Sequence, residues 1–133
     1  MNSREKGKRV ELKLVHELGK YGFDVRRGQQ YSGANGDADV VGIDGIHIEC
    51  KGVENLNIRE AMKQSYRDSR PDEYPVVMHK QNRKPWKVTM LAEDLAAMYN
   101  FWTAGIVQMH LPDGPLVEMS LEDWVTMYRT VTG

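Results

Sequence analysis

Two short apolar segments around Asp44-Gly45 constrain this chain more than any other feature. Residues 36–51 read GDADVVGIDGIHIECK, and apolar runs on both sides of an Asp-Gly pair are typical of a β-hairpin. Asp39, Glu49 and Lys51 stand within these runs, although a purely structural hairpin needs no charged groups there. The segment therefore predicts both a sheet and a place where charged side chains gather.

Length and composition predict one domain. The 133 residues, 41% of them hydrophobic, are enough to close a core. No hydrophobic segment follows the charged start, and the single cysteine, Cys50, cannot form an internal disulfide. We expect a single domain over residues 1–133, with its core over about 3–100, in a soluble cytoplasmic protein.

Charge is unevenly distributed along the chain. Residues 1–87 hold 17 Lys and Arg against 13 Asp and Glu, whereas residues 88–133 hold one Arg against six acids. A basic first part beside an acidic end is expected where one face meets a polyanion, and a merely solvated surface gives the same pattern.

Periodicity predicts the order of helices and strands. Apolar residues at helical spacing predict a helix over 3–21, ended by Gly22, and alternation predicts a strand in FDVRR before the polar loop GQQYSGANGD. The hairpin is followed by a helix that begins at an Asn57–Glu60 capping box and ends near Ser69. We then expect strands in YPVVMH and WKVTM and a helix over 93–99. We expect an α/β fold in which helices flank a mixed β-sheet.

The C-terminal part repeats itself. Residues 88–99 align without gaps with residues 117–128, at an offset of 29, and share six of twelve residues. The match indicates a duplicated strand-helix unit that extends the domain over 101–133, or a coincidence of two similar amphipathic patterns. Between the copies, Pro112-Asp113-Gly114 predicts another hairpin turn.

Glu11 points into the apolar face of the first helix. An ionised carboxylate there is costly unless it is paired or binds a metal, so a partner must come from elsewhere in the fold. An ordinary ion pair with Arg26 is one alternative, and a metal site is the other.

The register of the hairpin decides whether Asp39 and Glu49 meet. A two-residue Asp44-Gly45 turn places Asp39 across from Cys50, on the sheet face opposite Glu49. A three-residue loop with a bulge places Asp39 directly across from Glu49 but moves Val41 to the polar face. The separation of apolar from polar residues favours the first register, whereas a site built from both carboxylates requires the second.

A divalent cation would relieve the repulsion between opposed carboxylates. Carboxylate oxygens suit Mg²⁺ or Mn²⁺, and Lys51 lies on the same strand face as Glu49. His47 shares this face as a ligand or as a structural histidine, and the backbone carbonyl of Cys50 is a further candidate ligand.

These residues resemble the PD-(D/E)xK nuclease superfamily, in the arrangement of archaeal-type Holliday-junction resolvases and related phage or prophage nucleases. The resemblance covers about residues 3–90 and rests on the order helix-Glu11, strand-Asp39, Glu49-Cys50-Lys51 and basic helix, with Gly7 four residues before Glu11. It implies a restriction-endonuclease-like fold and a Mg²⁺-dependent homodimer that cuts branched DNA in recombination.

The resemblance also implies roles for single residues. Asp39 and Glu49 match the metal ligands, Lys51 the catalytic lysine, and Glu11 a further acidic ligand, direct or through water. The chain departs from the motif in one place, because Ala38 follows a second acid, Asp37, which is an alternative ligand or an outer-shell group. Gln64 resembles the glutamine that follows the catalytic lysine in RecB-type members.

Basic residues near the hairpin are candidate DNA contacts. A basic stripe on the second helix comprises Arg59, Lys63, Arg67 and Arg70, and the turn before WKVTM carries Lys80, Arg83 and Lys84. These cations would neutralise DNA phosphates, or they would simply be solvated. In the loop before the hairpin, Ser32 is a candidate active-site neighbour. The sequence therefore predicts an endonuclease, with a nonspecific or restriction-like nuclease and a noncatalytic DNA-binding module as alternatives.

Overall fold

The computed structural model describes residues 3–29, 38–104 and 112–133, which form one six-stranded sheet covered by four helices. The strands follow one another across the sheet in chain order: β1 (Arg26–Arg27), β2 (Val40–Val41), β3 (Ile46–Lys51), β4 (Tyr74–His79), β5 (Lys87–Leu91) and β6 (Leu116–Ser120). β3 and β4 pair in parallel and the other neighbours pair antiparallel. The predicted α/β fold with a mixed sheet is confirmed.

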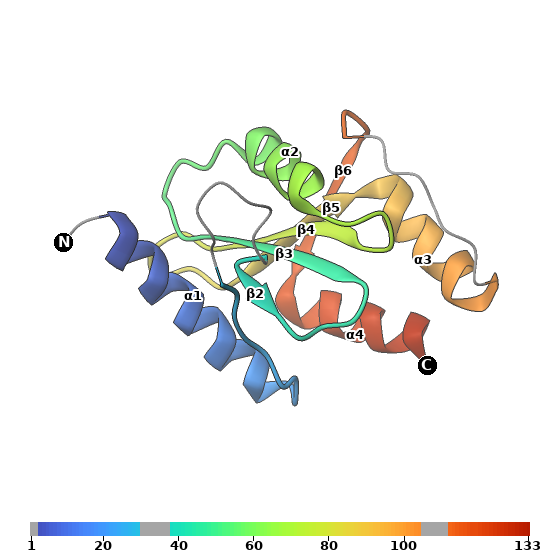
Figure 1. Ribbon diagram of the computed structural model, residues 1–133, viewed down its shortest axis with the longest axis horizontal. Helices are drawn as coiled ribbons and strands as arrows, with labels where there is room; N and C mark the ends of the chain where they lie inside the picture. The colour runs from blue at the N-terminus through green and yellow to red at the C-terminus, as the bar shows by residue number, and fades with distance from the viewer. Residues whose placement is uncertain (1–2, 30–37, 105–111) are drawn as a thin grey trace.

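The helices lie on both faces of the sheet (Figure 1). They are α1 (Ser3–Lys20), α2 (Ile58–Asp68), α3 (Ala92–Ala104) and α4 (Leu121–Thr132). The larger core joins α1, α3 and α4 to one face, where Ile48, Met78 and Trp124 are buried. A smaller core joins α2 to the other face through Met62 and Val77. None of the described helices is long and apolar enough to cross a membrane.

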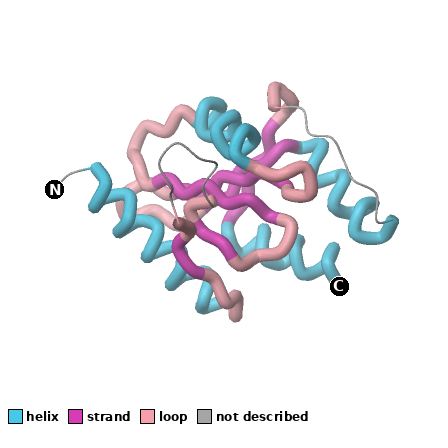
Figure 2. The backbone as a smooth tube through the Cα atoms, in the orientation of Figure 1, coloured by secondary structure: helices cyan, strands magenta, loops and turns pink. Residues whose placement is uncertain are grey.

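The ends of α2 follow the sequence signals. The side chain of Asn57 accepts a hydrogen bond from the N–H of Glu60 at 3.2 Å, and Ser69 forms the C-cap shortly before Pro71. The strands of the first part are shorter than predicted, because FDVRR contributes only β1 and ADVVGI only β2. The backbone tube in Figure 2 shows the loops that take their place.

The β2–β3 hairpin combines the two predicted geometries. Ile46 donates to the carbonyl of Ile43, which closes a turn at Asp44-Gly45, yet Val40 pairs with Ile48. Val41 at the end of β2 and Gly42, which follows it, therefore oppose one residue of β3, which is a β-bulge. Gly42 has a φ of +127°, and a Cβ there would lie 2.6 Å from the carbonyl oxygen of Asp24. The bulge requires glycine for both reasons.

The C-terminal repeat is visible in the fold. β6 begins 29 residues after β5, and α4 begins 29 residues after α3, as in the sequence alignment. The two strands pair antiparallel, and their helices pack on the same face of the sheet. The predicted hairpin partner of β6 falls within 105–111, which lies outside the described residues.

Candidate active site

Asp39 and Glu49 meet at the end of the β2–β3 pair. Val40 pairs with Ile48, and Asp39, which directly precedes β2, donates its N–H to the Ile48 carbonyl at 3.0 Å. This position brings the Asp39 side chain within hydrogen-bonding reach of Glu49. Burial, the charge of Glu49, a hydrogen bond to Glu49 and the charge of Glu11 raise the pKa of Asp39 to about 7. The Cys50 N–H, which donates to Asp39 Oδ2 at 2.8 Å, acts in the opposite direction. Asp39 therefore keeps its proton to a higher pH than an ordinary aspartate does.

His47 holds Glu49 from the neighbouring position on the same face of β3. Glu49 and His47 are only 3% and 2% exposed, and His47 Nε2 lies 3.2 Å from Glu49 Oε1. On the other side of the ring, His47 Nδ1 lies 3.7 Å from Glu73 Oε1. Burial alone would lower the pKa of His47, but the hydrogen bonds and charges of Glu49 and Glu73 raise it to about 9. His47 is therefore an imidazolium that compensates two carboxylates.

Glu11 is paired with an arginine, although not with the one expected. Arg27 Nε donates to Glu11 Oε1 at 2.9 Å, and the Glu11 side chain is 17% exposed. The sequence suggested Arg26, but Arg26 is exposed and hydrogen-bonds to the carbonyl of Arg27. Alternation along β1 explains the difference, since neighbouring strand residues point to opposite sides. The charge of Glu11 still contributes to the raised pKa of Asp39, so the three acids lie in one electrostatic neighbourhood.

Lys51 and Cys50 complete the strand end. Lys51 is the last residue of β3, is partly exposed, and accepts the backbone N–H of Lys80 at its carbonyl. Burial and then the charges of Asp39, Glu11 and Glu49 raise the pKa of the Cys50 thiol, against the charge of Lys51. The Cys50 thiol therefore stays protonated, and only its backbone carbonyl remains a candidate ligand.

The donor set fits a hard divalent cation. Among the residues with described positions, no three His, Cys, Asp or Glu side chains surround one point closely enough to hold a metal ion. Mg²⁺ usually keeps several waters and takes only one or two protein carboxylates, with substrate phosphates completing its shell. The carboxylates of Asp39 and Glu49 meet that need. Burial and then the charge of Glu49 raise the pKa of Asp39, and a bound cation would offset both effects.

The structure describes some of the other predicted site residues and not others. Asp37 and Ser32 lie outside the described residues, so the structure describes only Asp39 of the two aspartates. Gln64 lies partly buried on α2. Within the basic stripe, Arg59 donates to the carbonyl of Gly114 at 2.7 Å, and Lys63 Nζ lies 4.0 Å from Asp113 Oδ1. These two residues are therefore bound to the turn before β6.

The remaining basic candidates are open to solvent. Arg67 in the last turn of α2 and Arg70 just after this helix are exposed. Arg83 and Lys84 are exposed in the β4–β5 turn. Lys80 is partly exposed, and its Nζ lies 5.9 Å from the centre of the Trp86 ring.

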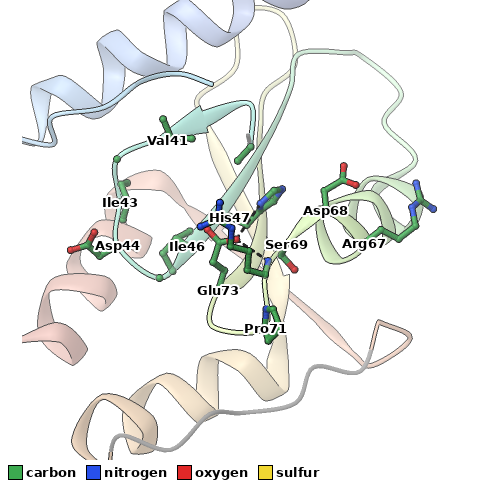
Figure 3. A pocket seen from close by; sticks show the side chains of 14 residues that line it. Val41, Ile43, Asp44, Ile46, His47, Arg67, Asp68, Ser69, Pro71 and Glu73 are labelled. Carbon is green, nitrogen blue, oxygen red and sulfur yellow. Dashed lines mark hydrogen bonds and ion pairs between the residues drawn. The ribbon is translucent and has the colours of Figure 1, made fainter. Parts of the chain in front are cut away.

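A cavity of about 520 Å³ adjoins His47 at the other end of β3 (Figure 3). His47 and Glu73 line it from one side, and Ser69 and Pro71 line it from the end of α2. Asp39, Glu49 and Lys51 do not line it. The cavity is therefore separate from the strand end that carries the acidic pair.

Sequence reasoning missed Arg27 and Glu73 and left the role of His47 open. His47 lies two residues before Glu49, which already placed both side chains on one strand face. No local signal identified Glu73, because it reaches His47 only through the parallel pairing of β3 with β4.

Comparisons with known proteins add little to this geometry. A scan of protein-family models finds none that matches the chain, and a search of curated proteins finds none that is similar. Among solved structures, the chain is similar to Hjc, a Holliday junction resolvase from the archaeal hyperthermophile Archaeoglobus fulgidus. The identity is 24%, the match covers 60% of this chain and 72% of Hjc, and the TM-score is 0.44. At these values the likeness carries no argument about the site.

Proposed function

We propose that the protein is a metal-dependent endonuclease that hydrolyses phosphodiester bonds in DNA, with Mg²⁺ as its cofactor and Mn²⁺ as a substitute. The observation that supports this most is the contact between the carboxyl groups of Asp39 and Glu49 beside the β2–β3 pair. A buried carboxylate next to a partly buried one destabilises a fold that has no use for the pair. A cation-binding role explains why the chain keeps them.

Each side chain has a role in this proposal. Asp39, Glu49 and the Cys50 carbonyl would hold the ion, with Glu11 as a further ligand, direct or through water. The ion would supply Lewis-acid stabilisation of the phosphate and acidify a water. Lys51 would place its ammonium group against the negative charge that develops on the phosphate. His47 would fix the orientation of Glu49.

The finer proposal is a structure-specific enzyme that resembles Holliday-junction resolvases and acts as a homodimer. It rests on the resemblance of Glu11, Asp39 and Glu49-Cys50-Lys51 to that family's motif. The alternative is a nonspecific or restriction-like nuclease with the same metal site. Sedimentation of the protein alone tests the dimer.

A cleavage assay tests the activity and separates these alternatives. Labelled four-way junction, matched linear duplex and single strand are incubated with Mg²⁺, with Mn²⁺ or with EDTA. We expect metal-dependent cutting, preferentially of the junction, that is lost in Lys51→Ala and retained in Lys20→Ala, which removes an equal charge from the far end of α1. Equal cutting of all DNAs would favour the nonspecific enzyme, and equal cutting by both variants would remove Lys51 from the mechanism.

A noncatalytic DNA-binding module is the second candidate, and two observations favour it. Arg27 already neutralises Glu11, and the described side chains include no three-member metal cluster. This candidate predicts salt-sensitive DNA binding that survives Glu49→Ala, with no metal-dependent cleavage by either protein.

A further inference from the structure

A second pocket lies between the N-terminal half of α1 and the β4–β5 turn, segments that lie side by side in Figure 1. Its volume is about 410 Å³. Three cations of α1, Lys6, Arg9 and Lys13, line one side. Lys80, with the amide side chains of Gln81 and Asn82, lines the other.

The walls of this pocket are fixed by packing. A Cβ on Gly52 would lie 2.8 Å from both methyl groups of Val10, so the loop after β3 approaches α1 more closely than another residue would allow. Glu54 Oε1 accepts the backbone N–H of Asn82 at 2.8 Å, and the Glu54 carbonyl accepts from Gln81 Nε2 at 2.8 Å. The pocket is therefore held open by the fold.

The pocket has an excess of positive charge. Glu54 is the only acidic residue among its described lining residues, and its carboxylate is bonded to the β4–β5 turn. Within the described parts of the chain, none of Lys6, Arg9 and Lys13 forms an ion pair. Clustered cations repel one another and attract an anionic partner.

We propose that this basic pocket binds the backbone phosphates of the nucleic-acid strand next to the acidic pair. The choice of nucleic acid as ligand rests on the proposed function. Gly52 follows Lys51, and Val10 precedes Glu11, so the pocket adjoins the candidate active site along both elements. Lys6, Arg9 and Lys13 form a row about 10 Å long on one side of α1. A row of cations suits the repeated phosphates of one strand.

The salt dependence of binding tests the proposal without requiring cleavage. Binding of a labelled duplex is measured with EDTA between about 50 and 200 mM salt. We expect Lys6→Gln/Arg9→Gln/Lys13→Gln to weaken binding and to reduce the slope of log K against log salt by about 2 to 3, since each lost phosphate contact removes about 0.9. A second variant, Lys6→Arg/Lys13→Arg, keeps the charge and should keep the slope.

A matched control removes the same charge elsewhere. Lys8→Gln/Lys20→Gln/Arg26→Gln changes three cations that do not line the pocket and should leave the slope nearly unchanged. Equal slopes for this control and the pocket variant would overturn the proposal. Inorganic phosphate that competes at the same molar concentration as DNA phosphate would also overturn it, because it would identify a small-anion site. A protein that binds in this way but cuts nothing would refute the nuclease and leave the pocket assignment standing.

Discussion

Replacing Asp39 with asparagine should stabilise the metal-free protein at alkaline pH. Between pH 3.8 and about 7 the folded state holds a proton on Asp39 that the unfolded state has lost, so folding stability falls as the pH rises across this window. A rise of the Asp39 pKa from 3.8 to about 7 corresponds to about 4 kcal/mol, which is an upper limit because Asp39 is partly exposed and solvent screens its interactions. Asparagine has no charge and still accepts the Cys50 N–H through its side-chain oxygen.

Urea denaturation with EDTA measures this effect. The free energy of unfolding of Asp39→Asn minus that of the wild type should rise by up to about 4 kcal/mol between about pH 4 and pH 8. Asp72→Asn, at an exposed turn, is the matched control and should show no such rise. Mg²⁺ should stabilise the wild type at pH 8 and not Asp39→Asn. A difference that stays constant with pH would refute the inference that burial and the charge of Glu49 disfavour the ionised form of Asp39.

Three further predictions concern stability, each measured by urea denaturation. His47→Leu leaves Glu49 buried without its cationic partner. Because the pKa of His47 is raised from 6.5 to about 9, the free energy of unfolding should fall by about 3 kcal/mol below pH 6.5, and this loss should fade as the pH rises through 9. A loss that does not depend on pH would contradict the pairing of His47 with Glu49. Gly42→Ala should cost at least about 2 kcal/mol through backbone strain and the clash with Asp24, and a neutral effect would refute the bulge. Asn57→Ala should cost about 1 kcal/mol by removing the α2 cap, whereas Asn57→Ser should cost little.

The elements whose signals are local were predicted from the sequence. Apolar spacing placed α1, the Asn57 cap and Pro71 bounded α2, and the 29-residue repeat located two matching strand-helix units. These patterns act over a few residues, so neighbouring side chains and backbone groups decide them without help from the rest of the fold.

The sequence by itself determined which acidic and basic residues stand at the ends of β2 and β3, and that a turn at Asp44-Gly45 connects them. Only the tertiary structure decided that Asp39 meets Glu49, because the bulge at Gly42 depends on the approach of Asp24 from another segment. In the same way, Arg27 rather than Arg26 reaches Glu11, and Glu73 reaches His47 across a parallel pair. Each outcome is a competition between partners distant in the chain, and the free energy that separates them arises only when the sheet and α1 are packed together.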